Sequence, residues 1–405
     1  MTIRLYYDHP DLVEFDSVVE EAVLAPPTES GVTRPSIVLR ETAFYPTSGG
    51  QIHDTGWLTL GGGERFRVAE VADAEDGRVI HYLEAPVRSV VGARVHGTID
   101  VARRRDHMQQ HTGQHVLSAA FIELYQMPTI SFHMGDDYCS IDLATPSLAA
   151  PQVIGAEKRA NEIVEENRPV TIRYVRRDEA EKLGLRKLPP AERDELRLIE
   201  IAEFDLSACG GTHVSATGQI GAILLRKTEK TRQGIRVEFV CGSRAVRTAR
   251  SDYSALTEAA ALFSSQLADV PEMIRKTFEE AKSLRRQRED ALDQLASAMA
   301  EAALKEGKII IRVFTDRDAN FAKLFAQKAV RLGAGLVALV ASTMDPPGVI
   351  FAQTPGGTAD MGALLKQSLA AVGGRGGGSR DFAQGGVPAG SDLEKLLREA
   401  AGKIG

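Results

Sequence analysis

Two short segments of this chain each carry a pair of side chains that bind transition metals well. The first is His111-Thr-Gly-Gln-His115 and the second is Cys209-Gly-Gly-Thr-His213. In a helix, residues i and i+4 lie one turn apart on the same face, so both histidines of the first segment can reach one ion. Two glycines disfavour a helix in the second segment, which we expect to be a tight loop. Imidazole and thiolate are preferred zinc ligands, and four of them complete a tetrahedron, so the two segments predict a zinc site.

The role of this metal depends on how many of the four side chains bind it at once. A site closed by all four resembles structural zinc, whereas one loose ligand leaves a position for water or substrate. Zinc in an open site lowers the pKa of bound water or orients the substrate as a Lewis acid, and we favour the orienting role. A metallopeptidase is excluded because the base of a His-Glu-x-x-His motif would stand where the chain has Thr112.

The composition excludes several classes of protein. The chain has 405 residues, of which 43% are hydrophobic, enough for two or three domains with buried cores. No run of about 18 apolar residues occurs, so we expect no membrane span. The three cysteines form no disulfide framework, which predicts a cytoplasmic location, and Cys139 and Cys241 fit small core positions.

The net charge of −6 argues against a nucleic-acid partner unless positive charge is concentrated locally. Arginine and lysine do gather between residues 103 and 250. Each group alone is explained by a solvated surface, but together they favour a polyanion binding near the metal site. The groups are Arg103 to Arg105, Arg173 with Arg176 and Arg177, the set from Arg226 to Arg236, and Arg244 with Arg247 and Arg250.

Residue patterns predict an α+β fold built from four parts. Short stretches of alternating apolar and polar residues, broken by glycine turns, predict a small N-terminal β-barrel. Mixed helix and strand patterns follow, then an almost entirely helical segment, and then a compact α/β pattern. The predicted bounds are 1–100 for the barrel, 101–242 for a zinc-dependent domain, 243–306 for a coiled-coil-like helical connector and 307–405 for the C-terminal domain.

The elements that must position the metal ligands can also be located. We expect a helix over 101–125, which carries both histidines of the first segment, and a strand over 196–201 that leads into the second. The long charged helix expected over 273–304 favours a homodimer through the connector and C-terminal domain, with a helix folded against its own chain as the alternative. Barrel strands are expected at 4–7, 36–40, 57–60, 65–71, 79–83 and 94–99.

A glycine-rich stretch near the C-terminus, residues 373–386, is expected to form a loop. It is not a P-loop, because no Gly-Lys-Ser/Thr ends it, and it lacks the strand–turn–helix setting of a Rossmann fingerprint. Glycine backbone can approach phosphate closely, and Arg375 and Arg380 add positive charge. Phosphate or RNA-backbone contact and a flexible connector are the two alternatives for this stretch.

Four features occur in one order along the chain. They are Phe44-Tyr-Pro-Thr-Ser-Gly-Gly-Gln-Ile-His-Asp-Thr-Gly56, Gln110-His-Thr-Gly-Gln-His115, Cys209-Gly-Gly-Thr-His213, and the glycine-rich stretch with the α/β unit before it. They resemble the editing domain and the C-terminal DHHA1-type domain of alanyl-tRNA synthetase. The aminoacylation core of the synthetase has no counterpart here, so the chain resembles the free-standing alanyl-tRNA editing proteins of the long AlaX type.

The resemblance implies a zinc-dependent deacylase that hydrolyses the ester of mischarged Ser-tRNA(Ala), or Gly-tRNA(Ala), with tRNA(Ala) as its partner. A pocket built for alanine cannot strongly reject serine, so an editing site must reward the serine hydroxyl. The candidate catalytic and substrate-contacting residues are Gln51, Gln114, Thr129 and Ser131. The family often has threonine just before the second histidine, and Gln114 at that place leaves the residue that reads the hydroxyl open.

Two other functions remain as alternatives. A non-catalytic tRNA-binding module would use zinc only to hold the fold, and would show four tightly bound ligands and no open cleft. A DHH-type phosphoesterase is disfavoured because its Asp-His-His run is missing, the nearest segment being Arg105-Asp106-His107-Met108.

Overall fold

The computed structural model describes residues 1–24, 35–85, 90–183, 185 and 194–404. They form two compact units, Met1–Glu258 and Ala259–Gly405, which are described separately. The described residues contain eight α-helices and twenty strands, which confirms the mixed α+β class. No helix among them is long and apolar enough to cross a membrane.

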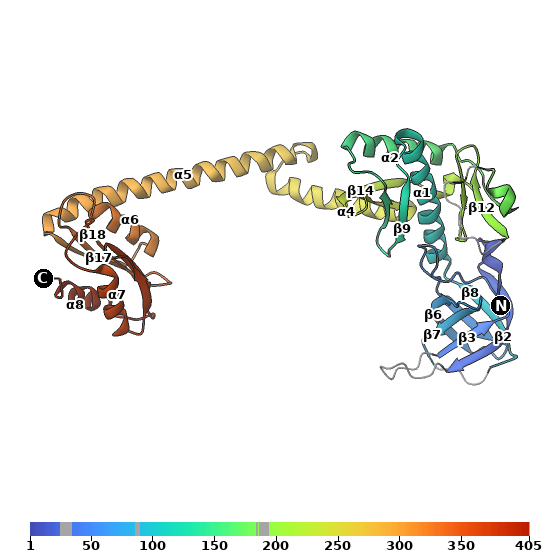
Figure 1. Ribbon diagram of the computed structural model, residues 1–405, viewed down its shortest axis with the longest axis horizontal. Coiled ribbons are helices and arrows are strands. Elements are labelled where there is room, and N and C mark those ends of the chain that lie inside the picture. Colours follow the sequence, from blue (N-terminus) through green and yellow to red (C-terminus); the bar gives the residue numbers. More distant parts are fainter. Residues whose placement is uncertain (25–34, 86–89, 184, 186–193, 405) are drawn as a thin grey trace. The chain divides into compact units, whose positions relative to one another are not determined.

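Six strands of the first unit close into a barrel in the order β2-β3-β7-β6-β5-β8, which confirms the predicted barrel (Figure 1). Successive strand residues point to opposite faces, so every second side chain can enter the interior. Phe15, Leu58, Val68 and Ile99 are among the residues of this core. The strands are β2 Glu14–Leu24, β3 Pro35–Leu39, β5 Gly56–Leu60, β6 Arg65–Asp73, β7 Val79–Leu83 and β8 Arg94–Ile99.

Two elements near the N-terminus differ from the prediction. The sequence pattern does not reveal β2, because a polar residue, Ser17, points inward and an apolar residue, Val18, points outward. The usual alternation of apolar inward and polar outward residues is therefore lost there. The strand expected over 4–7 is wrong beyond its first residue. The strand β1, Ile3–Arg4, pairs with β4, Glu41–Thr42, and Leu5–Tyr7 then form a 3₁₀ turn.

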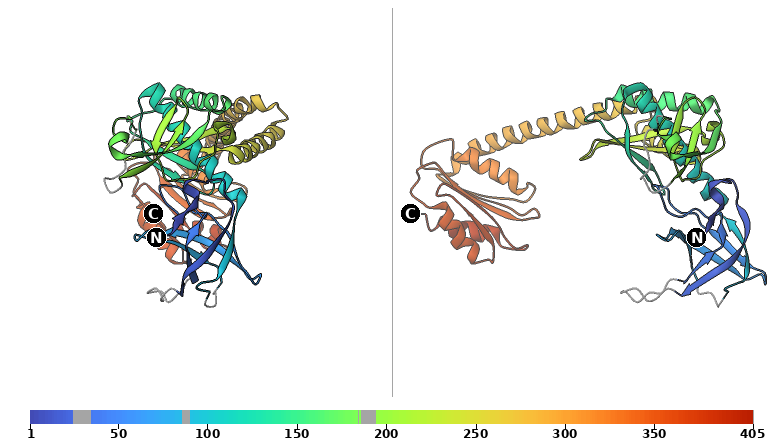
Figure 2. Two further views of the ribbon diagram at one scale, coloured as in Figure 1. Left: turned by 90° about the vertical axis from the view of Figure 1, so that its right-hand side faces the viewer. Right: turned by 45° about the vertical axis from the view of Figure 1, so that its right-hand side comes forward.

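The helix α1, Val101–Tyr125, has the predicted bounds and is buried along most of its length. Asp100 caps its N-terminus by accepting a hydrogen bond from the backbone N–H of Arg103. Gly113 allows α1 to approach strand β15, Ile235–Cys241, because a Cβ atom there would stand 2.3 Å from Cys241 Sγ. Helix α2, Ala150–Glu165, packs beside α1 (Figures 1 and 2).

Two antiparallel sheets complete the first unit around α1, in the orders β14-β15-β10-β9 and β11-β12-β13. The strand expected over 196–201 is confirmed as β12, and the short helix α3, Arg177–Ala180, follows β11. The strands are β9 Thr129–Met134, β10 Cys139–Leu143, β11 Val170–Arg176, β12 Glu195–Ile201, β13 Asp205–Ala208, β14 Ile223–Lys230 and β15 Ile235–Cys241.

A buried ion pair joins the barrel to α1. Arg104 is 1% exposed, and its Nη2 lies 2.5 Å from Asp54 Oδ2. The same guanidinium donates to the backbone carbonyls of Pro10 and Ala43, at 2.6 and 2.5 Å. The backbone N–H of Tyr45 donates to Asp54 Oδ2 at 2.7 Å, so one carboxylate holds both the helix and the loop after β4.

The second unit is a five-stranded sheet, in the order β16-β17-β18-β20-β19, with helices on both faces (Figure 2). The glycine-rich stretch was expected to be a loop, but it contains the paired strands β19 and β20. Glycine permits this close pairing, since a Cβ atom on Gly376 would lie 2.5 Å from Gly385 Cα. Its elements are β16 Ile309–Phe314, α6 Ala319–Ala329, β17 Val337–Ser342, β18 Gly348–Gln353, α7 Met361–Ala370, β19 Arg375–Gly378, β20 Phe382–Gly386 and α8 Leu393–Ala401.

The segment expected to be almost entirely helical forms two helices. They are α4, Gly242–Phe263, and α5, Val270–Ala303. Pro271 lies in the first turn of α5, where backbone N–H groups have no acceptor within the helix. The N–H that proline lacks is therefore not needed there. The C-terminal part of α5 contributes Ala296, Ala300 and Ala303 to the core that α6 forms with the sheet.

Candidate metal centre

The two sequence segments meet in the first unit. Helix α1 presents His111 and His115 one turn apart, and the loop after β13 presents Cys209 and His213, so that four ligand atoms lie within 4.8 Å of one another. Cys209 Sγ is 3.4 Å from His111 Nε2 and 3.3 Å from His213 Nε2. Thiolate and imidazole ligands of a tetrahedral ion stand about 3.5 Å apart. The donor types and their spacing therefore fit a transition-metal ion.

Gln51 orients the ring of His111. Gln51 Oε1 accepts a hydrogen bond from the backbone N–H of Thr212 at 3.1 Å, and its Nε2 donates to Thr212 Oγ1 at 2.8 Å. These contacts identify Oε1 as an acceptor, so His111 Nδ1, 2.7 Å away, is the donor in that contact. The Nε2 lone pair of His111 is then directed toward the other ligands, as in metal sites whose histidines donate through their second nitrogen.

The other two histidines have similar support. His115 Nδ1 lies 3.1 Å from Asp205 Oδ2, and His213 Nδ1 lies 3.2 Å from Thr112 Oγ1. Both contacts hold the Nδ1 side away from the cluster and leave Nε2 facing it. Sequence reasoning missed these supporting groups. Asp205 and Cys209 are four residues apart on one extended segment, a spacing that places them on one face and was an available signal.

The electrostatics of two of the four side chains, Cys209 and His213, favour the protonation states that a metal requires, whereas a metal would have to displace a proton from His115. Burial alone would raise the pKa of the Cys209 thiol, but His111 and His213 lower it well below its ordinary value. Burial lowers the pKa of His213 to about 3, with the charge of His111 acting in the same direction. Burial also acts to lower the pKa of His115, but its contacts with Asp205 and Cys209 raise it to about 9. A thiolate beside imidazoles is a metal-binding set.

The loop that carries Cys209 is held by backbone contacts. Arg197 Nη1 donates to the carbonyls of Cys209 and Gly211, at 2.6 and 3.1 Å. A Cβ atom on Gly211 would stand 2.1 Å from His111 Cε1, so only glycine lets the loop pass this close to the histidine ring. The Cys-Gly-Gly-Thr-His segment is the tight loop that its glycines predict.

The remaining predicted site residues form hydrogen bonds with side chains outside the cluster. Gln114 Nε2 donates to Ser118 Oγ at 2.8 Å, and Ser118 Oγ lies 2.7 Å from Thr129 Oγ1. Ser131 Oγ donates to Asp142 Oδ2 at 2.6 Å. From strand β9, the side chain that reaches the cluster is instead Phe132, which stacks on His111 with ring centroids 5.4 Å apart. Nothing in the sequence pattern distinguishes Phe132 from a core residue.

The cluster borders a small cavity of about 70 Å³, whose lining includes His111, Cys209, Tyr6, Tyr7 and Tyr45. The N-terminal 3₁₀ turn and the loop after β4 line this cavity together with His111 and Cys209. It gives the cluster an accessible side, although His111, His115 and His213 are themselves buried.

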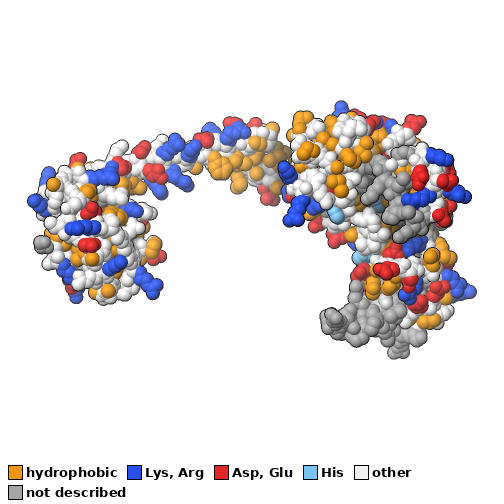
Figure 3. Space-filling model, viewed as in Figure 1, with side chains coloured by type: hydrophobic (Ala, Val, Ile, Leu, Met, Phe, Trp, Pro, Cys, Tyr) orange, Lys and Arg blue, Asp and Glu red, His pale blue; other side chains and the backbone are white. Residues whose placement is uncertain are grey.

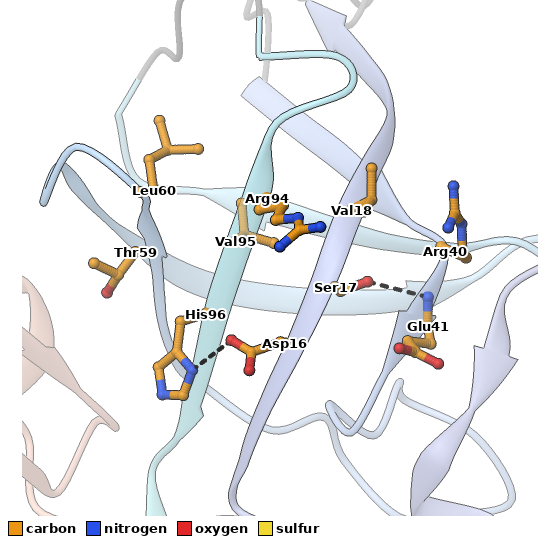
Figure 4. A pocket seen from close by; sticks show the side chains of 11 residues that line it. Asp16, Ser17, Val18, Arg40, Glu41, Thr59, Leu60, Arg94, Val95 and His96 are labelled. Carbon is orange, nitrogen blue, oxygen red and sulfur yellow. Dashed lines mark hydrogen bonds and ion pairs between the residues drawn. The ribbon is translucent and has the colours of Figure 1, made fainter.

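A larger cavity of about 430 Å³ lies on the barrel and has no lining residue in common with the cluster (Figure 4). His96 and Asp16 form a hydrogen bond of 2.9 Å at its edge, while Arg94 and Arg40 lie among strands of the barrel wall. Its basic groups are offset by Asp16 and Glu41, and it contains no set of metal ligands.

The expected polyanion-binding groups prove to be largely paired. Arg104 is buried against Asp54, and Arg244 is 3% exposed with its Nη2 2.6 Å from Asp106 Oδ2. Acidic and basic side chains are interspersed over the visible surface (Figure 3). Other members of the groups pair with Asp252, Asp142, Glu200 or Asp178. The concentrated positive surface that the sequence favoured is therefore much reduced.

Comparison with known proteins places two regions of the first unit in a defined class. A family model described as "tRNA synthetases class II (A)" matches residues 7–103. A second, "Threonyl and Alanyl tRNA synthetase second additional domain", matches residues 196–237, which include the candidate ligand Cys209. The chain thus combines regions related to synthetases that charge tRNA.

The chain is similar over almost its whole length to the alanyl-tRNA editing protein AlaX-L of Pyrococcus horikoshii. They are 30% identical over 400 residues, which cover 96% of this chain and 95% of that protein. The chain therefore belongs to the AlaX-L family of alanyl-tRNA editing proteins. It is also 30% identical to the alanine–tRNA ligase of Archaeoglobus fulgidus over 98% of the chain, but spans only 43% of that ligase.

Among solved structures, the C-Ala domain of Aquifex aeolicus alanyl-tRNA synthetase matches 23% of this chain and 88% of that domain, with 20% identity. The TM-score of 0.21 is too low for this likeness to define the fold of the second unit.

Proposed function

We propose that this protein is a zinc-dependent deacylase that hydrolyses the ester of mischarged Ser-tRNA(Ala), with Gly-tRNA(Ala) as a second substrate. The observation that carries the proposal is the four-residue cluster, two members of which line a cavity. The family relationship supports tRNA as the partner, since the AlaX-L relative is an alanyl-tRNA editing protein.

The residues around the cluster fit zinc better than a hard cation. Three imidazoles and one thiolate are nitrogen and sulfur donors, whereas magnesium and calcium take oxygen ligands. When bound, zinc would supply Lewis-acid chemistry, polarising or orienting the aminoacyl ester. The chain's own residues prepare the site, because Gln51 and Asp205 hold two ligand rings and Phe132 covers one of them.

The two predicted glutamines have different relationships to the cluster. Gln51 forms hydrogen bonds through both amide atoms, with Oε1 bonded to His111 and Nε2 to Thr212. These contacts suit a positioning role rather than contact with substrate. Gln114 donates to Ser118 instead. We assign to Gln51 the task of holding His111, and to the cavity residues the task of binding the aminoacyl group.

The alternative of a purely structural zinc is less well supported. Such a site is closed around its ion, whereas Cys209 and His111 line a cavity. The structure does not support the phosphoesterase alternative either. In the segment nearest to an Asp-His-His run, Asp106 pairs with Arg244 and His107 is 1% exposed. The cytoplasmic location, the homodimer and the four-part domain layout stay predictions.

Deacylation of defined substrates tests the proposal. Zinc-loaded full-length protein is incubated with Ser-tRNA(Ala), Gly-tRNA(Ala) and Ala-tRNA(Ala), and loss of each ester is followed. We expect faster loss of the seryl ester than of the alanyl ester, and its abolition in Cys209→Ala. Cys139→Ala, a buried cysteine outside the cluster, serves as the control. The proposal fails if no ester turns over faster than in buffer.

A further inference from the structure

The cavity beside the candidate metal ligands has room for a small side chain. Its volume is about 70 Å³. The space is large enough for a group the size of a methyl or hydroxymethyl side chain. Its walls come from the N-terminal turn, the loop after β4, and the ligand segments around His111 and Cys209.

Three tyrosines line this cavity, and the hydroxyl groups of two of them have hydrogen-bond partners. Tyr6 Oη accepts a hydrogen bond from Arg4 Nη1 at 3.3 Å, and Arg4 itself pairs with Asp73. Tyr45 Oη donates to the carbonyl of Ser48 at 3.1 Å. Tyr7 Oη has no hydrogen-bond partner among the residues that the structure describes. It is the tyrosine hydroxyl available to a bound molecule.

The ring of Tyr7 is held in place from several sides. It packs edge-on against Tyr6, with centroids 5.0 Å apart, and lies beside the guanidinium groups of Arg4 and Arg197 at 5.8 and 5.5 Å. Arg197 also donates from Nε to the Tyr7 carbonyl at 2.9 Å, while its Nη1 holds the Cys209 loop. One arginine thus ties the position of Tyr7 to that of a metal ligand.

Tyr7 also lies directly against the ligand loop. A Cβ atom on Gly210, the residue after Cys209, would lie 3.7 Å from Tyr7 Oη. The hydroxyl therefore lies next to the loop that carries Cys209, and Tyr7 lines the cavity that His111 borders. The other hydroxyl of the lining that has no partner among the described residues belongs to Ser48, which is solvent-exposed.

We propose that Tyr7 Oη forms a hydrogen bond with the hydroxyl of the seryl group, and that this contact makes the site prefer serine to alanine. The inference rests on the proposed function and names its specificity-determining residue. A phenol can both donate and accept, so it suits an alcohol. An alanyl group would fill the cavity and leave the Tyr7 hydroxyl without a hydrogen-bond partner. An unpaired hydroxyl costs free energy, so the alanyl group would bind more weakly.

This assignment replaces the residues that sequence reasoning favoured for reading the hydroxyl. Gln114, Thr129 and Ser131 do not line the cavity, and each makes the side-chain contact described above. Tyr7 stands far from them in the sequence, and only the folded N-terminal turn brings it to the metal ligands.

The test compares two esters of equal size that differ in the hydroxyl. Ser-tRNA(Ala) and 2-aminobutyryl-tRNA(Ala) are given to the wild-type protein and to Tyr7→Phe, which keeps the ring and its packing. We expect the wild type to prefer the seryl ester, and kcat/KM for that ester to fall about tenfold in Tyr7→Phe, the loss of roughly one hydrogen bond. The 2-aminobutyryl ester should change little, so the preference nearly disappears.

Tyr138→Phe is the matched control, because Tyr138 is 50% exposed and does not line this cavity. Metal content and thermal stability of each variant show that it is folded and loaded. An unchanged seryl preference in Tyr7→Phe, or equal slowing of both esters, overturns the inference while leaving the deacylase function standing.

Binding of a stable analogue separates this inference from the proposed function. The probe is 3′-deoxy-3′-(serylamino)adenosine, with the alanyl analogue as its comparison, and affinity is measured by calorimetry. If the wild type cleaves no ester, the proposed function fails, and Tyr7 is then judged by binding alone. Tighter binding of the seryl analogue that Tyr7→Phe removes supports the inference, and equal binding by both proteins overturns it.

Discussion

Gln51 Oε1 lies 2.7 Å from His111 Nδ1, and this contact joins a loop of the barrel region to the helix that carries two metal ligands. The same amide contacts Thr212 in the loop that carries the other two ligands. One buried side chain therefore couples three segments distant in the sequence. It explains how a flexible glycine loop and a helix keep the geometry that a metal requires.

Replacing Gln51 by alanine should weaken metal binding about 10- to 100-fold, because His111 loses the acceptor that fixes its ring. Affinity is measured by competition with a chromophoric chelator. Gln114→Ala is the matched control, since Gln114 donates to Ser118 and not to a ligand. Equal affinities in Gln51→Ala and the wild type would contradict the role assigned to Gln51.

The two glycines of the ligand loop should respond differently to the same substitution. Gly211→Ala would place a methyl group 2.1 Å from His111 Cε1, so we expect metal content to fall to a small fraction of the wild-type value. In Gly210→Ala the nearest atom lies at 3.7 Å, an ordinary contact, and metal content should be retained. Elemental analysis of both purified variants decides this, and a fully loaded Gly211→Ala would show that the loop relaxes.

The buried ion pair between the barrel and α1 should contribute far more to the free energy of unfolding than the neighbouring side chain of Arg105 does. Arg104→Met leaves Asp54 buried without its charged partner, and we expect the free energy of unfolding to fall by about 3–5 kcal/mol. Arg105→Met, on an exposed side chain, should change it by no more than about 0.5 kcal/mol. The one tryptophan of the chain, Trp57 in barrel strand β5, reports this transition in urea. Similar midpoints for the two variants would refute the prediction.

The barrel should lose stability as the pH falls below neutral. Burial lowers the pKa of His81 to about 4, below the ordinary value of about 6.5. The unfolded chain therefore binds the proton more readily, so this stabilisation is complete above about pH 6.5 and is lost as the pH falls toward 4. The full effect is about 3 kcal/mol.

Unfolding of wild type and His81→Gln is followed by Trp57 fluorescence between pH 7.5 and 4.5. We expect a shallower dependence on pH in the variant, because His107 and His213, whose pKa values are lowered to about 3, still contribute. Parallel curves for the two proteins would show that His81 does not carry the effect.

Local sequence determined a large part of this structure. The spacing of His111 and His115 required a helix, the glycines after Cys209 required a tight loop, and alternating residues indicated a barrel. Each of these features depends on neighbours within a few positions, so a single sequence reveals it. The bounds of α1 were predicted correctly for this reason.

Contacts between distant segments were decided only by the tertiary structure. The expected loop at 373–386 became paired strands because its glycines pack against each other, and several arginines expected on the surface became ion pairs. Tyr7 and Gln51 reach the metal ligands through folding of the N-terminal turn and the loop after β4. Hydrogen bonds and close packing between residues far apart in the sequence leave no periodic pattern in it. The sequence therefore determined the types of the candidate metal ligands. Only the fold determined which side chains hydrogen-bond to those ligands and which residues line the cavity beside them.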